Sequence, residues 1–85
     1  ELLAANFTNW SNAIEHCLVD AGNRIPQDQD LKALGEFVLT VMEGAVMQTR
    51  TYRDIGYFDR NIAQLRDHFV RLERIAVVDA NRQLG

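Results

Sequence analysis

The hydrophobic pattern of the chain is dominated by the stretch from residue 30 to residue 53, whose apolar side chains are spread over most of a helical wheel. At about 100° per residue its strongest stripe lies along one side, and the plainly polar side is narrow. We therefore predict a helix over about residues 29–53 that needs neighbours on more than one side. The stripe consists of Leu31, Leu34, Val38, Val41, Met42, Ala45 and Thr49.

The first stretch of the chain, about residues 2–21, also has the periodicity of an amphipathic helix. Gly22 supplies a residue that tolerates positive φ at the helix end, and Pro26 prevents the helix from continuing. Asp28 or Asp30 then caps the central helix. The apolar positions of the first helix are Leu3, Phe7, Trp10, Ile14, Cys17 or Leu18, and Ala21.

The last stretch alternates apolar steps of four and three residues, which is typical of a helix packed lengthwise on another helix. We predict this helix over about residues 56–79, after a break at Arg53–Gly56, with a frayed tail from Asp79 to Gly85. The expected fold is all-α, with three antiparallel helices in a single domain, residues 1–85. The stripe is Phe58, Ile62, Leu65, Phe69, Leu72 and Ala76.

Two glycines lie inside the central helix, far from its ends. Gly35 and Gly44 each cost about 1 kcal/mol of helix propensity relative to alanine. Interior glycines often mark places where another backbone comes close. We favour close packing over simple tolerance, and the smooth patch of Gly44 and Ala45 is the expected contact.

Composition narrows the functional classes. The chain has 85 residues, 47% of them hydrophobic and 25% charged, with a net charge of −3. One lysine and eight dispersed arginines argue against a nucleic-acid face, which would need many cationic contacts to phosphate. No apolar run is long enough for a membrane span, and no basic leader precedes Leu2, so we expect a cytoplasmic protein. Because an apolar helix begins at once, we also expect a fragment of a longer protein.

Side chains with catalytic or metal-binding potential are sparse. His16 and His68 have no metal-ligand spacing and are expected at the surface or its rim. Cys17, the single cysteine, is expected to be a buried, inert thiol. Glu36 and Glu43 share a helix face, but the Glu-x-x-His pattern of di-iron bundles is absent, so both are expected to be solvated. We predict no catalytic residues, no metal, no cofactor and no enzymatic activity.

Several large apolar side chains could line a ligand cavity, although a simple core is the more frequent use of such residues. Gln48 and Thr49 are polar positions beside the stripe of the central helix. They could orient a ligand in an apolar pocket. They could equally bond within the helix or across a subunit contact.

A longer pattern extends over most of the chain. The aromatic-rich first helix with Trp10 precedes an acid-started helix whose middle carries a Glu-Gly-Ala segment, and a short break after Arg53-Asp54 leads to the Phe58 helix. From about Phe7 to Ile75 this arrangement resembles the C-terminal domain of TetR/AcrR-type transcriptional regulators. The likeness is carried by Leu34-Gly35-Glu36-Phe37-Val38, Met42-Glu43-Gly44-Ala45-Val46-Met47-Gln48-Thr49-Arg50, Phe58-Asp59, Leu65-Arg66 and Phe69-Val70-Arg71-Leu72.

The resemblance implies a homodimer in which the last two helices form a four-helix bundle with those of a second subunit. The expected interface is Gly44, Met47, Thr51, Phe58, Ile62, Leu65, Phe69 and Leu72. Alternatively, the heptad stripe is used within the subunit, and its flank at Ala63, Arg66 and Val70 meets the partner.

The resemblance also implies that the first helix closes one side of a cavity for a small hydrophobic or aromatic effector. Its expected lining is Phe7, Trp10, Ile14, Cys17, Met42, Gln48 and Thr49. DNA would be bound only through an N-terminal helix-turn-helix domain, which residues 1–85 do not contain. The protein would thus be the dimerisation and effector-sensing part of a repressor-like regulator.

The rival interpretation is a free-standing helical protein-protein interaction module without a ligand cavity. It explains the same apolar stripes. Residues upstream of Glu1 would discriminate, since a basic helix-turn-helix supports the regulator and a start methionine supports the module.

Overall fold

The computed structural model describes the backbone of residues 2–84 and the side chains of residues 5–82. It contains three α-helices, α1 (Leu2–Ala21), α2 (Leu31–Tyr52) and α3 (Gly56–Leu84), with a short 3₁₀ turn, η1 (Gly22–Arg24), after α1. The described residues include no strand. The all-α prediction with three helices is therefore confirmed.

The third helix is longer than the sequence pattern indicated. It continues to Leu84, whereas the apolar periodicity ends near Asp79. All the residues from 80 to 84 except Asn81 have high helix propensity, so the helix can continue there without a packed face. The expected fraying over residues 79–84 is not seen, and Gly85 lies outside the described residues.

The connection between α1 and α2 uses the residues that the sequence singled out. Gly22 has a φ of 57°, in the left-handed region, so it ends α1 as expected. Of the two candidate caps, Asp30 is the one used, because its Oδ1 accepts a hydrogen bond of 3.0 Å from the backbone N–H of Ala33. Ile25 and Pro26, which lie in the connection between Gly22 and Asp30, are buried.

The turn between α2 and α3 is tight. Arg53 adopts the left-handed conformation with a φ of 53°. The carbonyl of Thr49 accepts a hydrogen bond of 3.1 Å from the N–H of Asp54. Asp54 Oδ1 in turn accepts a hydrogen bond of 2.8 Å from the N–H of Gly56. With the rings of Tyr52 and Tyr57 stacked across the turn, their centroids 4.6 Å apart, these contacts join α2 and α3 as a hairpin.

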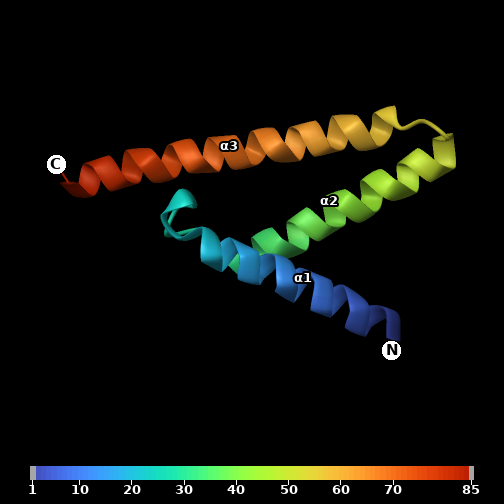
Figure 1. Ribbon diagram of the computed structural model, residues 1–85, viewed down its shortest axis with the longest axis horizontal. Helices are drawn as coiled ribbons and strands as arrows, with labels where there is room; N and C mark the ends of the chain where they lie inside the picture. The colour runs from blue at the N-terminus through green and yellow to red at the C-terminus, as the bar shows by residue number, and fades with distance from the viewer. Residues whose placement is uncertain (1, 85) are drawn as a thin grey trace.

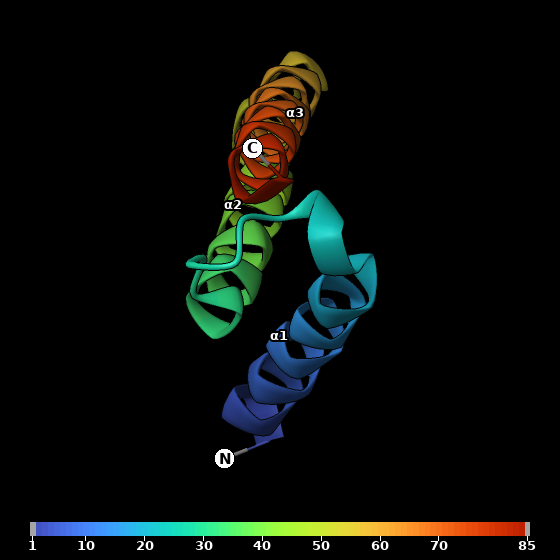
Figure 2. The same ribbon diagram turned by 90° about the vertical axis from the view of Figure 1, so that its left-hand side faces the viewer.

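Successive helices run in opposite directions (Figure 1), and α1 crosses the N-terminal half of α2 before the two diverge like the arms of a V. Seen along the hairpin, α1 lies apart from α3, and the connection that contains η1 lies between them (Figure 2). The molecule measures 51 × 31 × 14 Å, and its radius of gyration is 15.3 Å. A compact chain of this length would have a radius of gyration of about 12 Å. The arrangement is therefore flat and open.

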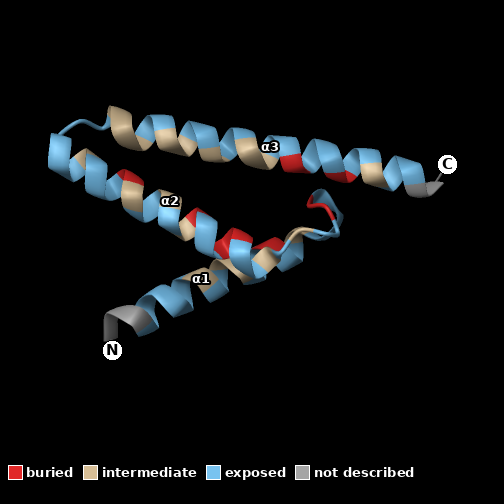
Figure 3. Cartoon of the chain, turned by 180° about the vertical axis from the view of Figure 1, so that it is seen from behind, coloured by how far each residue is buried: buried red, intermediate tan, exposed pale blue. Residues whose placement is uncertain are grey.

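The core is small and lies where the three helices approach one another. Leu18, Ile25, Leu34 and Leu72 form a buried cluster, and Figure 3 shows buried positions concentrated at this end and along the facing sides of α2 and α3. No large side chain in the described part of the chain is less than 2% exposed. The cluster is completed by the partly buried Ile14, Ala21, Leu31 and Phe69.

The remaining surface is large for the mass of the chain. Its accessible area is 6569 Å². The mass of the chain is 9.7 kDa. A compact monomer of this mass would expose about 5100 Å². Large hydrophobic side chains on all three helices are exposed, among them Trp10, Met47, Ile75 and Val77. The fold thus leaves apolar faces that a further surface can cover.

Candidate functional site

The crossing of α1 and α2 is fixed by a glycine. A Cβ placed on Gly35 would lie 3.0 Å from the carbonyl oxygen of Ser11 and 3.2 Å from the backbone N of Glu15. Both distances are shorter than ordinary van der Waals contact, so the two backbones can approach this closely because residue 35 has no side chain. Close backbone packing is confirmed at Gly35, whereas at Gly44, where the contact was expected, a Cβ would meet none of the described atoms within 4 Å.

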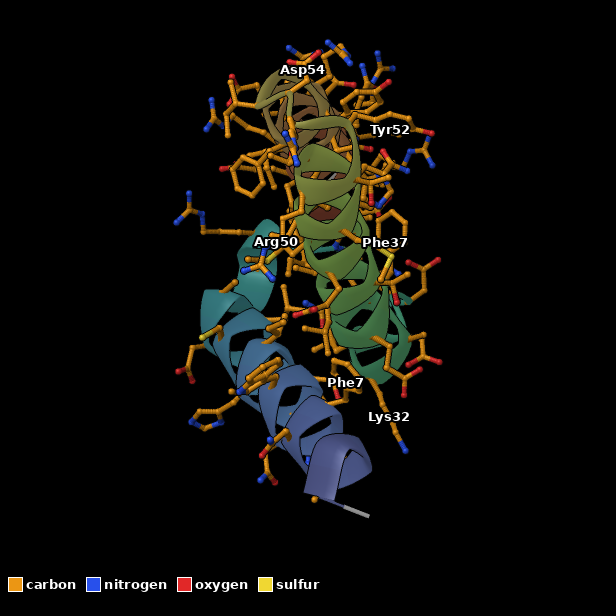
Figure 4. The ribbon with its side chains drawn as sticks, turned by 90° about the vertical axis from the view of Figure 1, so that its right-hand side faces the viewer. Phe7, Lys32, Phe37, Arg50, Tyr52 and Asp54 are labelled. Carbon is orange, nitrogen blue, oxygen red and sulfur yellow. The ribbon has the colours of Figure 1, made fainter. Side chains whose placement is uncertain are left out.

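Beyond this crossing the two helices enclose a groove of about 480 Å³ that is open to solvent. Its size is in the range of pockets for small molecules. Figure 4 shows Phe7 between α1 and α2 on this side of the molecule. The lining residues are Phe7, Thr8 and Ser11 from α1, and Glu36, Leu39, Thr40, Glu43, Gly44 and Met47 from α2.

The groove combines an apolar surface with two carboxylates. Phe7, Leu39 and Met47 supply large apolar side chains. Two of its hydroxyls already donate hydrogen bonds within their own helices, Ser11 Oγ to the carbonyl of Thr8 (3.1 Å) and Thr40 Oγ1 to the carbonyl of Glu36 (2.9 Å). The groups left to act on a ligand are therefore the apolar side chains and the carboxylates.

Neither carboxylate of the groove is neutralised within the described part of the chain. Ion pairs there join His16 to Asp20, Arg24 to Glu73 and Arg71 to Asp67. Glu36 and Glu43 belong to none of them, and the groove lining contains no lysine, arginine or histidine. The predicted solvation of both carboxylates agrees with their exposure, but they also form a charged wall of the groove.

Only one residue of the expected effector cavity, Phe7, lines this groove. Trp10 is 49% exposed and packs edge-on against Phe7, with ring centroids 5.9 Å apart. Ile14 packs against the core cluster instead. Met42 and Gln48 are exposed on α2 and do not line the groove.

Cys17 and Thr49, the other expected cavity residues, lie elsewhere. The prediction of a buried Cys17 is wrong, because its neighbour Leu18 takes the inward position on α1 and the thiol is exposed. Thr49 is half-buried, and its Oγ1 is buried with no hydrogen-bond partner among the described residues. Thr49 therefore holds an unsatisfied hydroxyl away from the groove.

The residues of the expected dimer interface fall into four groups. Gly44 and Met47 line the groove, and a Cβ placed on Gly44 would meet no atom within 4 Å. Thr51 is exposed beyond it. On α3, Leu72 belongs to the core cluster and Phe69 packs against that cluster. The half-buried members of the same stripe are Phe58, Ile62 and Leu65.

The stripe of α3 is thus used at least partly within the subunit, and its flank is free. Ala63, Arg66 and Val70 are exposed. Val70 also borders a shallow hollow of about 450 Å³ on the outer face of α3. Seven residues after Val70, Val77 continues the same face at heptad spacing. The hollow is lined by Val70, Glu73, Arg74, Val77 and Val78.

The remaining polar clusters show no reactive arrangement. His68 is held between Phe37 and Phe69, with ring centroids 5.5 Å and 6.1 Å away. Arg71 Nε donates a hydrogen bond of 2.8 Å to Asp67, and this bond together with the carboxylate charge raises the pKa of Arg71 above its ordinary value. Among the described residues, no group of three or more histidine, cysteine or acidic side chains could hold a metal ion.

The sequence carries a signal for the groove that an analysis of single helices misses. Glu36, Thr40, Glu43 and Met47 follow one another at steps of four, three and four, so they share a face of α2. The charges on this face predict a solvent-facing side. Where α1 lies over part of such a face, the same charges become part of a concave surface.

The comparison with known families identifies a match over most of the chain. Residues 1–64 match the family model described as transcriptional regulator LmrA/YxaF-like, C-terminal domain, which is a TetR-type domain. No curated protein and no solved structure matches the chain. Within the described residues, no helix has the length and apolar character needed to cross a membrane.

Proposed function

We propose that this chain, which belongs to the family of LmrA/YxaF-like C-terminal domains of TetR-type transcriptional regulators, is a dimerisation and small-molecule-sensing domain. The family match over residues 1–64 carries the proposal, and it agrees with the resemblance seen in the sequence. DNA contact is expected from a separate helix-turn-helix domain of the full-length regulator, in the cytoplasm. A regulatory rather than enzymatic role follows from the same match.

The partner surface that we propose is the outer face of α3. Leu72 and Phe69 already pack inside the subunit, so the exposed flank of the stripe is the better candidate. Val70 and Val77 lie on this flank at heptad spacing, and Arg66 and Glu73 lie beside them with opposite charges. A second copy could place the same flank of its α3 against this one, as two-fold symmetric interfaces do.

The area of the chain supports a partner. Its accessible surface exceeds that of a compact monomer of this mass by about 1400 Å². An interface of standard size buries about 800 Å² on each partner. The excess is therefore sufficient for a dimer contact and still leaves the groove between α1 and α2 open.

The groove is the proposed effector site. It has an apolar surface, lies between two helices and is large enough for a drug-sized molecule. A ligand there would touch both arms of the V, so its binding would change the balance between more open and more closed arrangements of α1 and α2. Through α1, such a shift would be passed on to the helix-turn-helix domain that is expected in the full-length regulator.

Binding of a neutral apolar probe tests the sensing role. N-phenyl-1-naphthylamine gains fluorescence in an apolar site, and we expect saturable binding to the purified chain. Met47→Asp should weaken this binding by placing a charge on the apolar side of the groove, whereas Ile55→Asp, an equally exposed position outside it, should not. Absence of saturable binding would contradict the sensing role.

A further inference from the structure

We propose that the groove between α1 and α2 selects organic cations with an aromatic or otherwise apolar body, a choice that rests on the proposed sensing function. The charge of the lining is the first reason. Among the described residues that line it, the two charged ones, Glu36 and Glu43, are both acidic, and none is basic. A ligand in contact with this lining therefore meets negative charge only.

The carboxylates are available for a ligand. Neither takes part in an ion pair within the described part of the chain. The nearest cations on α2 are Lys32, one turn before Glu36, and Arg50, two turns after Glu43. Figure 4 shows Arg50 on the side of α2 that faces α1, but neither Lys32 nor Arg50 lines the groove. On α1, the face toward α2 continues from Ser11 to Glu15, which adds another acid and no base.

The apolar side chains define the body of the ligand. Phe7 from α1 stands across from Leu39 and Met47 of α2, and the ring of Trp10 packs against Phe7. Aromatic rings attract cations placed over their faces, and methionine adapts to flat apolar surfaces. Such a lining favours a bulky, weakly hydrated cation over a small, strongly hydrated one such as an alkali-metal ion.

The spacing of the charges indicates the size of the ligand. Glu36 and Glu43 are seven residues apart on one face of a helix, which corresponds to about 10 Å along its axis. A cation near the middle of the groove can approach both carboxylates, and an elongated dication can engage one with each end. The volume of about 480 Å³ accommodates either.

A matched pair of ions tests the proposal. Tetraphenylphosphonium and tetraphenylborate have nearly the same shape and opposite charges, so their difference in affinity reports the charge preference. Trp10, the single tryptophan, packs against a lining residue and reports binding through its fluorescence. We expect the phosphonium to bind at least tenfold more tightly than the borate at low ionic strength. Added salt should reduce the difference.

Charge-removing variants assign the preference to the groove. Glu36→Gln and Glu43→Gln should each weaken phosphonium binding about threefold, a size suited to exposed ion pairs. The matched control is Asp28→Asn, which removes the same charge from the connector outside the groove and should leave the affinity unchanged. Circular dichroism and N-phenyl-1-naphthylamine affinity verify that each variant keeps its fold and its apolar site.

The outcomes separate this inference from the proposed function. Equal or tighter binding of the borate, no phosphonium binding, or unchanged affinity in both glutamate variants overturns the cation preference. If the neutral probe still binds in those cases, the sensing function stands without it. If neither the ions nor the neutral probe bind, both the preference and the sensing role are wrong.

Discussion

The backbone of α2 at Gly35 rests directly on the backbone of α1 at Ser11, so that a Cβ on Gly35 would lie 3.0 Å from the Ser11 carbonyl oxygen. The contact is between two main chains, and neither can move without shifting a helix. It sets the point from which α1 and α2 diverge, and with it the width of the groove. The shape of the candidate site therefore depends on residue 35 being a glycine.

Replacing this glycine should destabilise the fold. Gly35→Ala adds helix propensity of about 1 kcal/mol, but the forced separation of α1 and α2 should outweigh it and leave a net loss of about 1–2 kcal/mol in the free energy of unfolding. Urea unfolding followed by circular dichroism measures the change. An increase in stability would contradict a tight contact at Gly35, because it would mean that the backbone of α1 yields to the added methyl group.

Gly44→Ala is the matched control, since the same substitution is made in the same helix. None of the described atoms lies within 4 Å of a Cβ at this position, so none of them opposes the gain in helix propensity. We expect stabilisation by about 0.5–1 kcal/mol.

The two glycines show what the sequence could and could not predict. Gly35 and Gly44 both lie well inside the helix, and both suggested close packing. Which of them meets a backbone depends on where α1 crosses, and the spacing of apolar residues along one helix does not determine a crossing point. The helices themselves, the Gly22 stop and a cap at Asp28 or Asp30 were predictable because each depends on a few neighbouring residues.

The buried hydroxyl of Thr49 gives a second prediction. Its Oγ1 has no hydrogen-bond partner among the described residues. Such a group destabilises the folded state by about 1–3 kcal/mol. Thr49→Val keeps the shape and removes the hydroxyl, so we expect a higher thermal midpoint. Thr40→Val is the control, because the exposed Thr40 hydroxyl already bonds to a carbonyl. A marked loss of stability in Thr49→Val would mean that the hydroxyl has a partner.

The position of Leu72 of α3 in the hydrophobic core gives a third prediction. Leu72 is 7% exposed and lies in the cluster shared by the three helices. Leu72→Ala should therefore cost about 2–4 kcal/mol of stability, independent of protein concentration. Ile75→Ala, three residues away and half exposed, should change stability by less than about 1 kcal/mol. A loss in Leu72→Ala that disappears on dilution would instead place Leu72 in a subunit contact.

The α3 stripe also marks where sequence reasoning reached its limit. A four-three repeat predicts that the helix packs lengthwise against another helix, and Phe69 and Leu72 do pack within the subunit. The repeat carries no information on whether that neighbour belongs to the same chain or to a second one. Similarly, Glu36 and Glu43 were correctly placed on one polar face, but the concavity beside them arises only when α1 is added.

Sedimentation equilibrium over a range of micromolar concentrations tests the dimer contact and, with it, the account of this chain as a dimerisation domain. We expect a reversible dimer for the unmodified chain. Val70→Glu and Val77→Glu should each give a monomer with unchanged helical content, because they place a charge in the middle of the proposed interface. Val19→Glu, an equally exposed valine on α1, should remain dimeric. A chain that is monomeric at all these concentrations would contradict the account, and dimers that persist in both α3 variants would place the contact elsewhere.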